Sequence, residues 1–151
     1  MLSIAEIAAE VRAVDVDLVV GLDVREVDQL ASSWQIGGLP KAYVEFLRLM
    51  GSGAGRILLG TDAFYPAILD LPRATHDFFA DNVGGVKLPE GALVFAMHQG
   101  YQVYWMDSLN VADPSVTLYM EEEEAPMARW KSFTEFVNAE YLSAYSPDRK
   151  R

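Results

Sequence analysis

The feature that most constrains this fold is a pair of β-rich runs between Ala92 and Asp107, which flank the dipeptide Gln99-Gly100. Glycine accepts the positive φ of a two-residue primed turn, so the sequence predicts an antiparallel hairpin about this turn. Pairing about the turn places on one face Val94, Ala96, His98, Tyr101, Val103 and Trp105. The other face then carries Leu93, Phe95, Met97, Gln102, Tyr104 and Met106. Because both faces are mostly apolar, the hairpin is predicted to lie centrally, with helices covering it.

Helix-start signals precede the hairpin at two places. Ser3 is followed three residues later by Glu6, the spacing of a capping box, in which each side chain bonds a free backbone N–H at the helix start. Asp23 and Glu26 repeat this spacing. The apolar residues at helical spacing behind these pairs are Ile4, Ile7, Ala8 and Val11, then Val24, Val27, Ala31 and Trp34. Two amphipathic helices are therefore predicted.

Three further elements are predicted before the hairpin. Leu39-Pro40 opens a helix, because the fixed φ and missing N–H of proline are tolerated in the first turn, and Gly51 ends it. The apolar face of this helix consists of Tyr43, Phe46, Leu47 and Met50. The apolar run Arg56–Gly60 is predicted as a short strand. Another helix is predicted from about Pro72 to Asn82, with Gly84-Gly85 ending it.

After the hairpin, the sequence predicts one more strand and a final helix. Asp113-Pro114 marks a turn, and Ser115–Met120 is predicted as the third strand of the sheet. Ser132 and Glu135 have the spacing of a capping box. The apolar residues of the helix that they open are Phe133, Phe136, Val137, Tyr141 and Ala144.

The order of these elements predicts an α+β fold, in which a small antiparallel β-sheet built on the central hairpin packs against N- and C-terminal helices. The length of 151 residues suits one domain, which is predicted over residues 1–146. Residues 147–151 are predicted to form a polar C-terminal tail that frays.

Composition limits the classes of partner. The chain has 12 Lys and Arg residues against 22 Asp and Glu residues, which gives a formal net charge of −10. This charge argues against nucleic-acid binding, which needs clustered cations for the phosphates, and it permits a basic protein partner. The absence of cysteine excludes disulfides, thiolate metal sites and a cysteine nucleophile.

No segment of the sequence signals secretion or membrane insertion, so a cytoplasmic protein is predicted. Glu6 and Glu10 lie where a secretory signal needs a basic start and an unbroken apolar core. The longest apolar runs, such as Leu18–Leu22, are far shorter than the roughly 20 residues that span a bilayer.

Residues with catalytic chemistry are present, but none belongs to a recognisable motif. The two histidines, His76 and His98, lack metal-ligand spacing, and His98 is predicted to be partly buried and bonded to a neighbour. Asp107 and Asp113, with the glutamates after the third strand, are candidates for the paired carboxylates of glycoside hydrolysis or hard-cation binding. Carboxylates at strand ends are also ordinary surface residues, and this interpretation is preferred. No catalytic residue, metal or cofactor is therefore predicted.

Short motifs occur in order along both halves of the chain. In the first half they are Leu39-Pro40, Tyr43, Phe46-Leu47, the turn at Gly51 and the run Ile57–Leu59. In the second half they are Leu88-Pro89, His98-Gln99-Gly100-Tyr101, Trp105 and Ser132-Phe133. In order and spacing these motifs resemble those of the SUKH superfamily, over about residues 23–142, although residues 61–87 carry no matching motif. Members of this Smi–Knr family include bacterial toxin-immunity proteins and fungal regulators of cell-wall glucan synthesis.

The resemblance implies a protein-binding module without catalysis, and two functions remain open. The first is an immunity protein that binds and neutralises a cognate bacterial toxin, of the basic nuclease type that an acidic partner suits. The alternative is an intracellular regulatory or scaffold protein of the cell-wall glucan synthesis regulator type. Because partner surfaces vary in this family, no binding residue is carried over by motif.

Two groups of residues are candidates for partner contact on chemical grounds. The first is the acidic run of Glu121, Glu122, Glu123 and Glu124. Its ordinary alternative is a solvated loop at the end of a strand. The second consists of the aromatic residues Tyr101, Tyr104 and Trp130, which fit the apolar patterns less well and, like Tyr119, are candidates for exposure. Their alternative role is to cover the sheet edges or cap the core.

Overall fold

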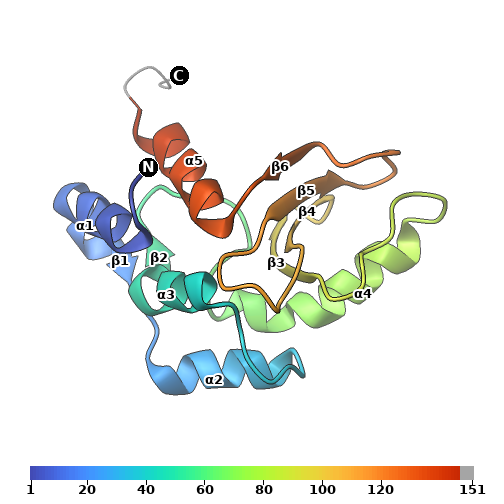
Figure 1. Cartoon of the computed structure of the whole chain (residues 1–151), viewed down its shortest axis with the longest axis horizontal. Coiled ribbons are helices and arrows are strands. Elements are labelled where there is room, and N and C mark those ends of the chain that lie inside the picture. The colour runs from blue at the N-terminus through green and yellow to red at the C-terminus, as the bar shows by residue number, and fades with distance from the viewer. Residues whose placement is uncertain (147–151) are drawn as a thin grey trace.

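The structure, a computed structural model, describes residues 1–146 and has an α+β fold in which helices surround a four-stranded antiparallel sheet (Figure 1). The helices are α1 (Ile4–Val14), α2 (Val24–Ser33), α3 (Lys41–Met50), α4 (Leu71–Asp81) and α5 (Phe133–Tyr145). The strands of the main sheet, in spatial order, are β3 (Leu93–His98), β4 (Gln102–Met106), β5 (Val116–Met120) and β6 (Ala128–Trp130). A separate two-stranded sheet consists of β1 (Val19–Val20) and β2 (Gly53–Ala54). The predicted fold class is confirmed, and the predicted tail, 147–151, lies outside the described residues.

Two helices cover opposite faces of the main sheet, as predicted for a hairpin with two apolar faces. Side chains alternate between faces along a strand, so the neighbours Tyr104 and Trp105 of β4 point to opposite sides. The ring centroid of Tyr104 lies 5.5 Å from that of Phe136 in α5. On the other face, the ring centroid of Trp105 lies 6.2 Å from that of Phe79 in α4. Figure 1 shows these two helices on either side of the strands.

The turn of the predicted hairpin is confirmed, but the pairing next to it differs by one residue. Gln99 and Gly100 have φ angles of 54° and 80°, and the N–H of Tyr101 donates to the carbonyl of His98 at 3.2 Å. Strand pairing starts between His98 and Gln102, so Tyr101 belongs to the loop. His98 therefore shares a face with Gln102, whereas the sequence analysis placed it on the face of Tyr101.

A bulge between Val94 and Ala96 restores the predicted alignment in the far half of the hairpin. Between the bulge and the turn, Ala96 pairs with Tyr104 and Met97 pairs with Val103. The side chains of Ala96 and Met97 consequently lie on the faces opposite to those predicted. A bulge adds one residue to one strand and so exchanges the faces on one side of it, which periodicity alone does not reveal.

The apolar run Arg56–Gly60 forms turns, so the strand predicted there was wrong. Ile57 and Leu58 are buried, and Leu58 has a φ of 55°, which is outside the β region. The strands that do form nearby are β1 and β2, in which Val19 faces Ala54. β1, β2 and β6 were not predicted, because strands of two or three residues are too short to show an alternating pattern.

Helix starts follow the predicted capping chemistry, with one difference. Both bonds of the capping box are present at the starts of α1 and α2, in the pairs Ser3–Glu6 and Asp23–Glu26. At α5, the Ser132 hydroxyl accepts a hydrogen bond from the N–H of Glu135 at 3.0 Å. The reciprocal bond, from the N–H of Ser132 to the carboxylate of Glu135, is not formed, so this cap is half of a box.

Tyr43 lies at the centre of the aromatic core between α3, α5 and β3. Its ring is stacked with that of Trp34 and lies edge-on to that of Phe133, with centroid distances of 6.1 and 5.5 Å. The Tyr43 hydroxyl is fully buried and has no hydrogen-bond partner among residues 1–146. Burial of this hydroxyl raises the pKa of Tyr43 strongly. The hydroxyl thus loses its water contacts on folding without replacement.

We expect Tyr43→Phe to raise the free energy of unfolding by about 1–2 kcal/mol, because it removes a buried polar group that has no partner. Urea denaturation of both proteins at pH 7 measures this difference. A variant that is less stable than the wild type by a similar amount would contradict the expectation and would indicate that the hydroxyl has a partner in solution.

Candidate protein-binding surface

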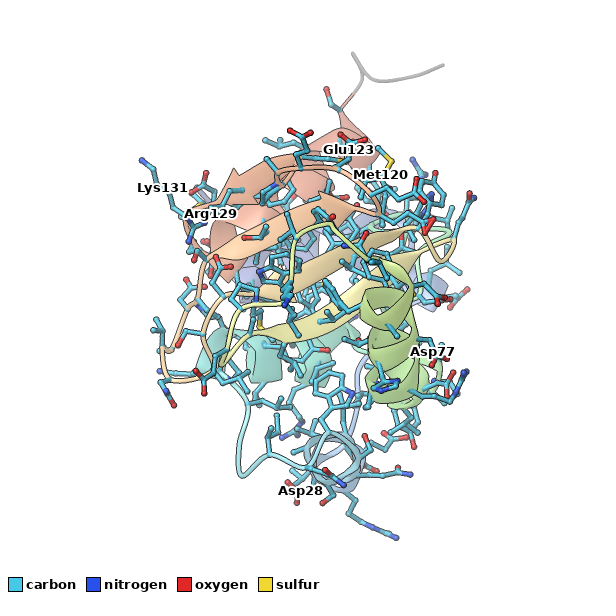
Figure 2. All side chains as sticks on the ribbon, turned by 90° about the vertical axis from the view of Figure 1, so that its right-hand side faces the viewer. Asp28, Asp77, Met120, Glu123, Arg129 and Lys131 are labelled. Carbon is cyan, nitrogen blue, oxygen red and sulfur yellow. The ribbon has the colours of Figure 1, made fainter. Side chains whose placement is uncertain are left out.

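The acidic loop, Glu121–Glu124, joins β5 to β6 and exposes all four of its carboxylates. Among the described residues, none of these side chains forms a hydrogen bond or an ion pair. Figure 2 shows Glu123 beside Met120 at one end of the sheet, whereas Arg129 and Lys131 lie at the other end. The acidic loop therefore presents negative charge that no cation in the described part of the chain neutralises.

Two buried side chains hold the backbone of the acidic loop. The Tyr119 hydroxyl donates to the carbonyl of Glu123 at 2.8 Å, and the Asn82 Oδ1 accepts from the N–H of Glu122 at 2.7 Å. The Asn82 Nδ2 in turn donates to the Tyr119 hydroxyl at 2.9 Å, as does the N–H of Val86 at 3.0 Å. The loop thus has a fixed backbone and free carboxylates, an arrangement that reduces the entropy lost on binding.

Tyr119, a candidate for exposure in the sequence analysis, is fully buried. Its ring lies against Phe78 of α4 and Trp105 of β4. Its hydroxyl forms hydrogen bonds both with the acidic loop and with the backbone of Val86, which follows α4. Asn82 was not singled out by the sequence analysis. A lone Asn after a helix usually indicates only a C-terminal cap, so no local signal identified it as the anchor of a loop 40 residues away.

We expect Tyr119→Phe to loosen the acidic loop, because three hydrogen bonds converge on the hydroxyl that is removed. The free energy of unfolding is expected to fall by about 1–3 kcal/mol, and amide exchange at Glu122 and Val86 is expected to become faster. Hydrogen exchange followed by NMR measures both effects. Tyr101→Phe is the matched control, and equal exchange rates in the two variants would show that the Tyr119 hydroxyl does not anchor the loop.

Three exposed apolar side chains accompany the acidic loop. The carbonyl of Tyr101 at the hairpin tip accepts from the N–H of Glu121 at 2.9 Å, and the Tyr101 side chain is exposed. Val83 follows the anchor Asn82 and is 91% exposed, and Met127 precedes β6 and is also exposed. We call these three residues together with Glu121–Glu124 the acidic end. Aromatic and aliphatic groups within a charged rim are the usual composition of a protein interface.

The other two aromatic candidates lie elsewhere. Tyr104 and Trp130 are half-buried, and both pack against Phe136 of α5, with ring centroids 5.5 and 5.0 Å from it. Trp130 ends β6 and pairs with Val116 at the start of β5, whereas the acidic loop follows the last residue of β5. The structure thus brings Tyr101 together with the four glutamates and separates Tyr104 and Trp130 from them. The contact roles of all these residues stay predictions.

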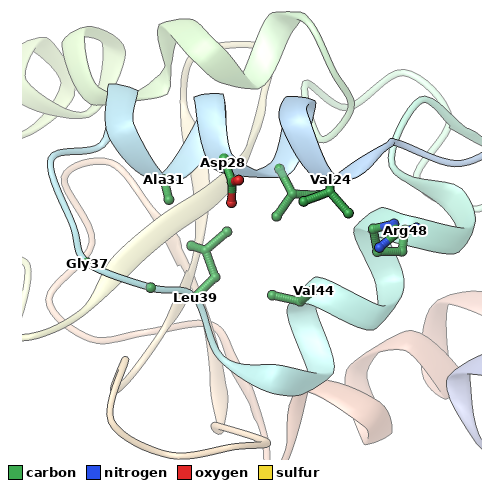
Figure 3. A pocket seen from close by; sticks show the side chains of 9 residues that line it. Val24, Asp28, Ala31, Gly37, Leu39, Val44 and Arg48 are labelled. Carbon is green, nitrogen blue, oxygen red and sulfur yellow. The ribbon is translucent and has the colours of Figure 1, made fainter.

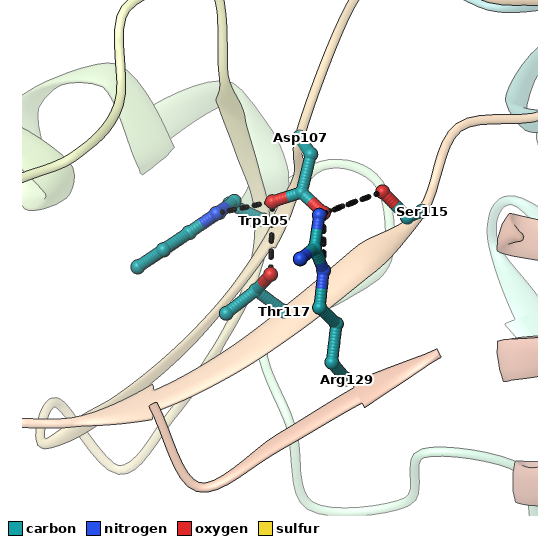
Figure 4. Close-up of polar contacts among 5 residues, drawn as sticks. All are labelled: Trp105, Asp107, Ser115, Thr117 and Arg129. Atoms are coloured by element: carbon teal, nitrogen blue, oxygen red, sulfur yellow. Dashed lines mark hydrogen bonds and ion pairs between the residues drawn. The ribbon is translucent and has the colours of Figure 1, made fainter. Parts of the chain in front are cut away.

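The Asp107 carboxylate, a candidate for paired-carboxylate chemistry, is saturated by donors from the sheet (Figure 4). Its Oδ1 accepts from Trp105 Nε1 and Thr117 Oγ1, both at 2.8 Å. Its Oδ2 accepts from Ser115 Oγ at 2.6 Å and from Arg129 Nη2 at 3.1 Å. Burial alone would raise the pKa of Asp107, but these hydrogen bonds and the Arg129 charge together bring it below its usual range. Asp107 therefore joins neighbouring strands and has no acceptor capacity aimed at a substrate.

The remaining candidates for catalysis are engaged by neighbours or scattered. Asp113 Oδ1 accepts from the N–H of Thr134 at 2.9 Å, in the first turn of α5. His98 shares a hydrogen bond with Thr61 through Nδ1 at 3.2 Å and lies edge-on to Tyr101, as predicted for a histidine bonded to a neighbour. Within residues 1–146, no three His, Asp or Glu side chains are grouped so that they could hold a metal ion.

A concave surface of about 220 Å³ lies between α2 and α3. Figure 3 shows Val24, Leu39 and Val44 pointing into this groove, with Asp28 and Arg48 also lining it. Val24 was predicted to belong to the buried stripe of α2, but it is 54% exposed. With one acid and one base in its lining, the groove offers a basic partner no excess of negative charge.

The antiparallel sheet between α4 and α5, with the short motifs in their expected order, defines a SUKH-like α+β domain. The profile of the SMI1 / KNR4 family (SUKH-1) matches residues 21–139, and the chain therefore belongs to this family. A search of the curated proteins finds no match. Membership is consistent with an immunity-type or a regulatory protein. In the described part of the chain, no helix has the length and apolar character needed to cross a membrane.

Proposed function

We propose that this protein is a non-catalytic immunity protein, which binds a basic, nuclease-type bacterial toxin domain in the cytoplasm and neutralises it. The observation that carries the proposal is the acidic loop, whose four exposed carboxylates pair with no cation among residues 1–146 and whose backbone is held by Asn82 and Tyr119. The formal net charge of −10 and the membership of the SMI1 / KNR4 family support the same partner chemistry.

The physical basis of the proposal is electrostatic complementarity. A nuclease carries cations for its polyanionic substrate, so a surface of fixed negative charge increases the rate of encounter with it. Close contact would then come from Tyr101, Val83 and Met127, the exposed apolar residues of the acidic end. The absence of catalysis is supported by the engagement of Asp107 and Asp113 with donors of the chain itself.

Co-expression tests this function and separates it from the regulatory alternative. The full chain is produced in cells together with each member of a panel of basic nuclease toxin domains, and growth is recorded. We expect rescue from one toxin and co-purification with it in a stoichiometric complex. Failure to rescue from any toxin, together with stable capture of a housekeeping protein, would contradict the proposal and favour a regulatory scaffold.

A further inference from the structure

A polar cleft separates the hairpin from the C-terminal half of α5. It has a volume of about 260 Å³, and its remaining wall is the turn-rich segment that ends at Thr61. The hairpin contributes His98, Gln102 and Tyr104 to its lining, and α5 contributes Glu140. Most of these lining residues carry polar side chains, and the cleft is large enough for one side chain.

Among residues 1–146, Glu140 has no ion-pair partner. It is half-buried, and among the described residues its carboxylate forms no hydrogen bond or ion pair. Burial raises the pKa of Glu140, and burial together with the nearby Glu140 charge raises the pKa of Tyr104. At neutral pH the cleft thus contains a carboxylate that has lost part of its hydration and has gained nothing in return.

The cation in the cleft wall is already engaged. Arg56 Nε lies 3.2 Å from Asp15 Oδ2, and its guanidinium carbon lies 5.0 Å from the ring centroid of Tyr145. The Tyr145 hydroxyl also accepts from the N–H of Arg56 and donates to Asp15 Oδ2. Arg56 is therefore held at one side of the cleft by Asp15, and within the described part of the chain no cation pairs with Glu140.

The cleft adjoins the acidic end through two contacts. Gln102 lines the cleft, and its Nε2 lies 3.6 Å from the Met127 sulfur, while His98 lies against Tyr101 at the hairpin tip. A partner that covers the acidic end would therefore also reach the cleft. The group that best suits this lining is a planar cation, because a guanidinium donates to several acceptors at once and stacks on aromatic rings.

We propose that this cleft is a recognition site for an arginine side chain of the protein partner, with Glu140 as its counter-ion and with Tyr104, Gln102 and His98 as its polar walls. This inference rests on the proposed function in one respect only, which is that the arginine belongs to a toxin. The carboxylate of Glu140 would regain on binding the electrostatic stabilisation that it lacks in the free protein.

The site can be tested without the partner, by NMR titration of the ¹⁵N-labelled full chain with Nα-acetyl-arginine amide at constant ionic strength. We expect saturable shifts at residues 98–104 and 140–144, weaker binding of Nα-acetyl-lysine amide, and no binding of the neutral citrulline analogue. Glu140→Gln is expected to weaken arginine binding by about tenfold or more, since it removes a charge-assisted hydrogen bond. Glu10→Gln, which changes an exposed carboxylate of α1, is expected to have no effect.

Two results would overturn the site. One is equal binding of the arginine and citrulline amides, and the other is unchanged arginine affinity in the Glu140→Gln variant. Growth rescue reports on the function separately. Arginine binding without rescue from any toxin would support the arginine site and reject the immunity role. Rescue without arginine binding would support the immunity role and reject the arginine site.

Discussion

Changing all four glutamates of the acidic loop, Glu121–Glu124, to lysine is expected to slow association with the basic toxin partner by about ten- to a thousandfold at low salt. The replacements raise the formal net charge by eight from −10 and reverse the field where the toxin docks. The salt dependence of the association rate is expected to weaken at the same time, because the screened attraction has been removed. Stopped-flow mixing at several salt concentrations measures both quantities.

A control with the same change in net charge separates local from global electrostatics. Glu10, Asp28, Glu45 and Glu90 are exposed, lie outside the acidic end and form no ion pair among the described residues. Changing these four residues to lysine is expected to slow association much less. If the control slows association as strongly, only total charge matters; if the acidic-loop variant associates at the wild-type rate, the loop is not part of the interface.

The second large effect is expected at Asp107, where Asp107→Ala should lower the free energy of unfolding by about 2–4 kcal/mol. The replacement removes the acceptor of Trp105, Ser115 and Thr117 and leaves Arg129 without its ion-pair partner. Urea denaturation at pH 7 measures the loss. Asp70→Ala is the control, since its ion pair with Arg73 is exposed to solvent and is expected to contribute much less to stability. Equal losses in the two variants would contradict the assigned role of Asp107.

The pH dependence of stability independently tests the stabilising role of the Asp107 carboxylate. Because the pKa of Asp107 is lowered in the folded state, the unfolded state binds the proton more readily. The contribution of the ionised Asp107 to the free energy of unfolding is therefore complete above the pKa of the unfolded state, near 3.9. It is lost as the pH falls through the lower pKa of the folded state. We expect Asp107→Ala to lose less stability than the wild type over this range. Parallel acid-denaturation curves would contradict this expectation.

Helices and the position of the hairpin could be predicted because their signals are local. The pairs Ser3–Glu6 and Asp23–Glu26 cap helices through bonds between residues three apart, so sequence spacing determines the contact. Gly100 likewise identifies the hairpin turn through its own backbone preference. What spacing does not determine is the register, which depends on the bulge near Val94 and on pairing across strands.

The candidate site was predicted in part, for the same reason. The exposure of Glu121–Glu124 follows from four consecutive charges, and the structure agrees with it. The anchoring of this loop depends on Asn82 and Tyr119, which meet only through the tertiary fold. The cleft at Glu140 combines residues of the hairpin, α5 and the segment near Thr61, so no pattern within a single element indicates it.

Hydrogen exchange of the chain, alone and in complex with the toxin from which it rescues growth, tests the central claim most directly. We predict protection on binding at residues 82–86, 99–104 and 119–127, which include the acidic end and its anchors. Protection confined to α1 and α2, with exchange in the acidic loop unchanged, would contradict the claim that this protein binds a basic partner through the acidic end.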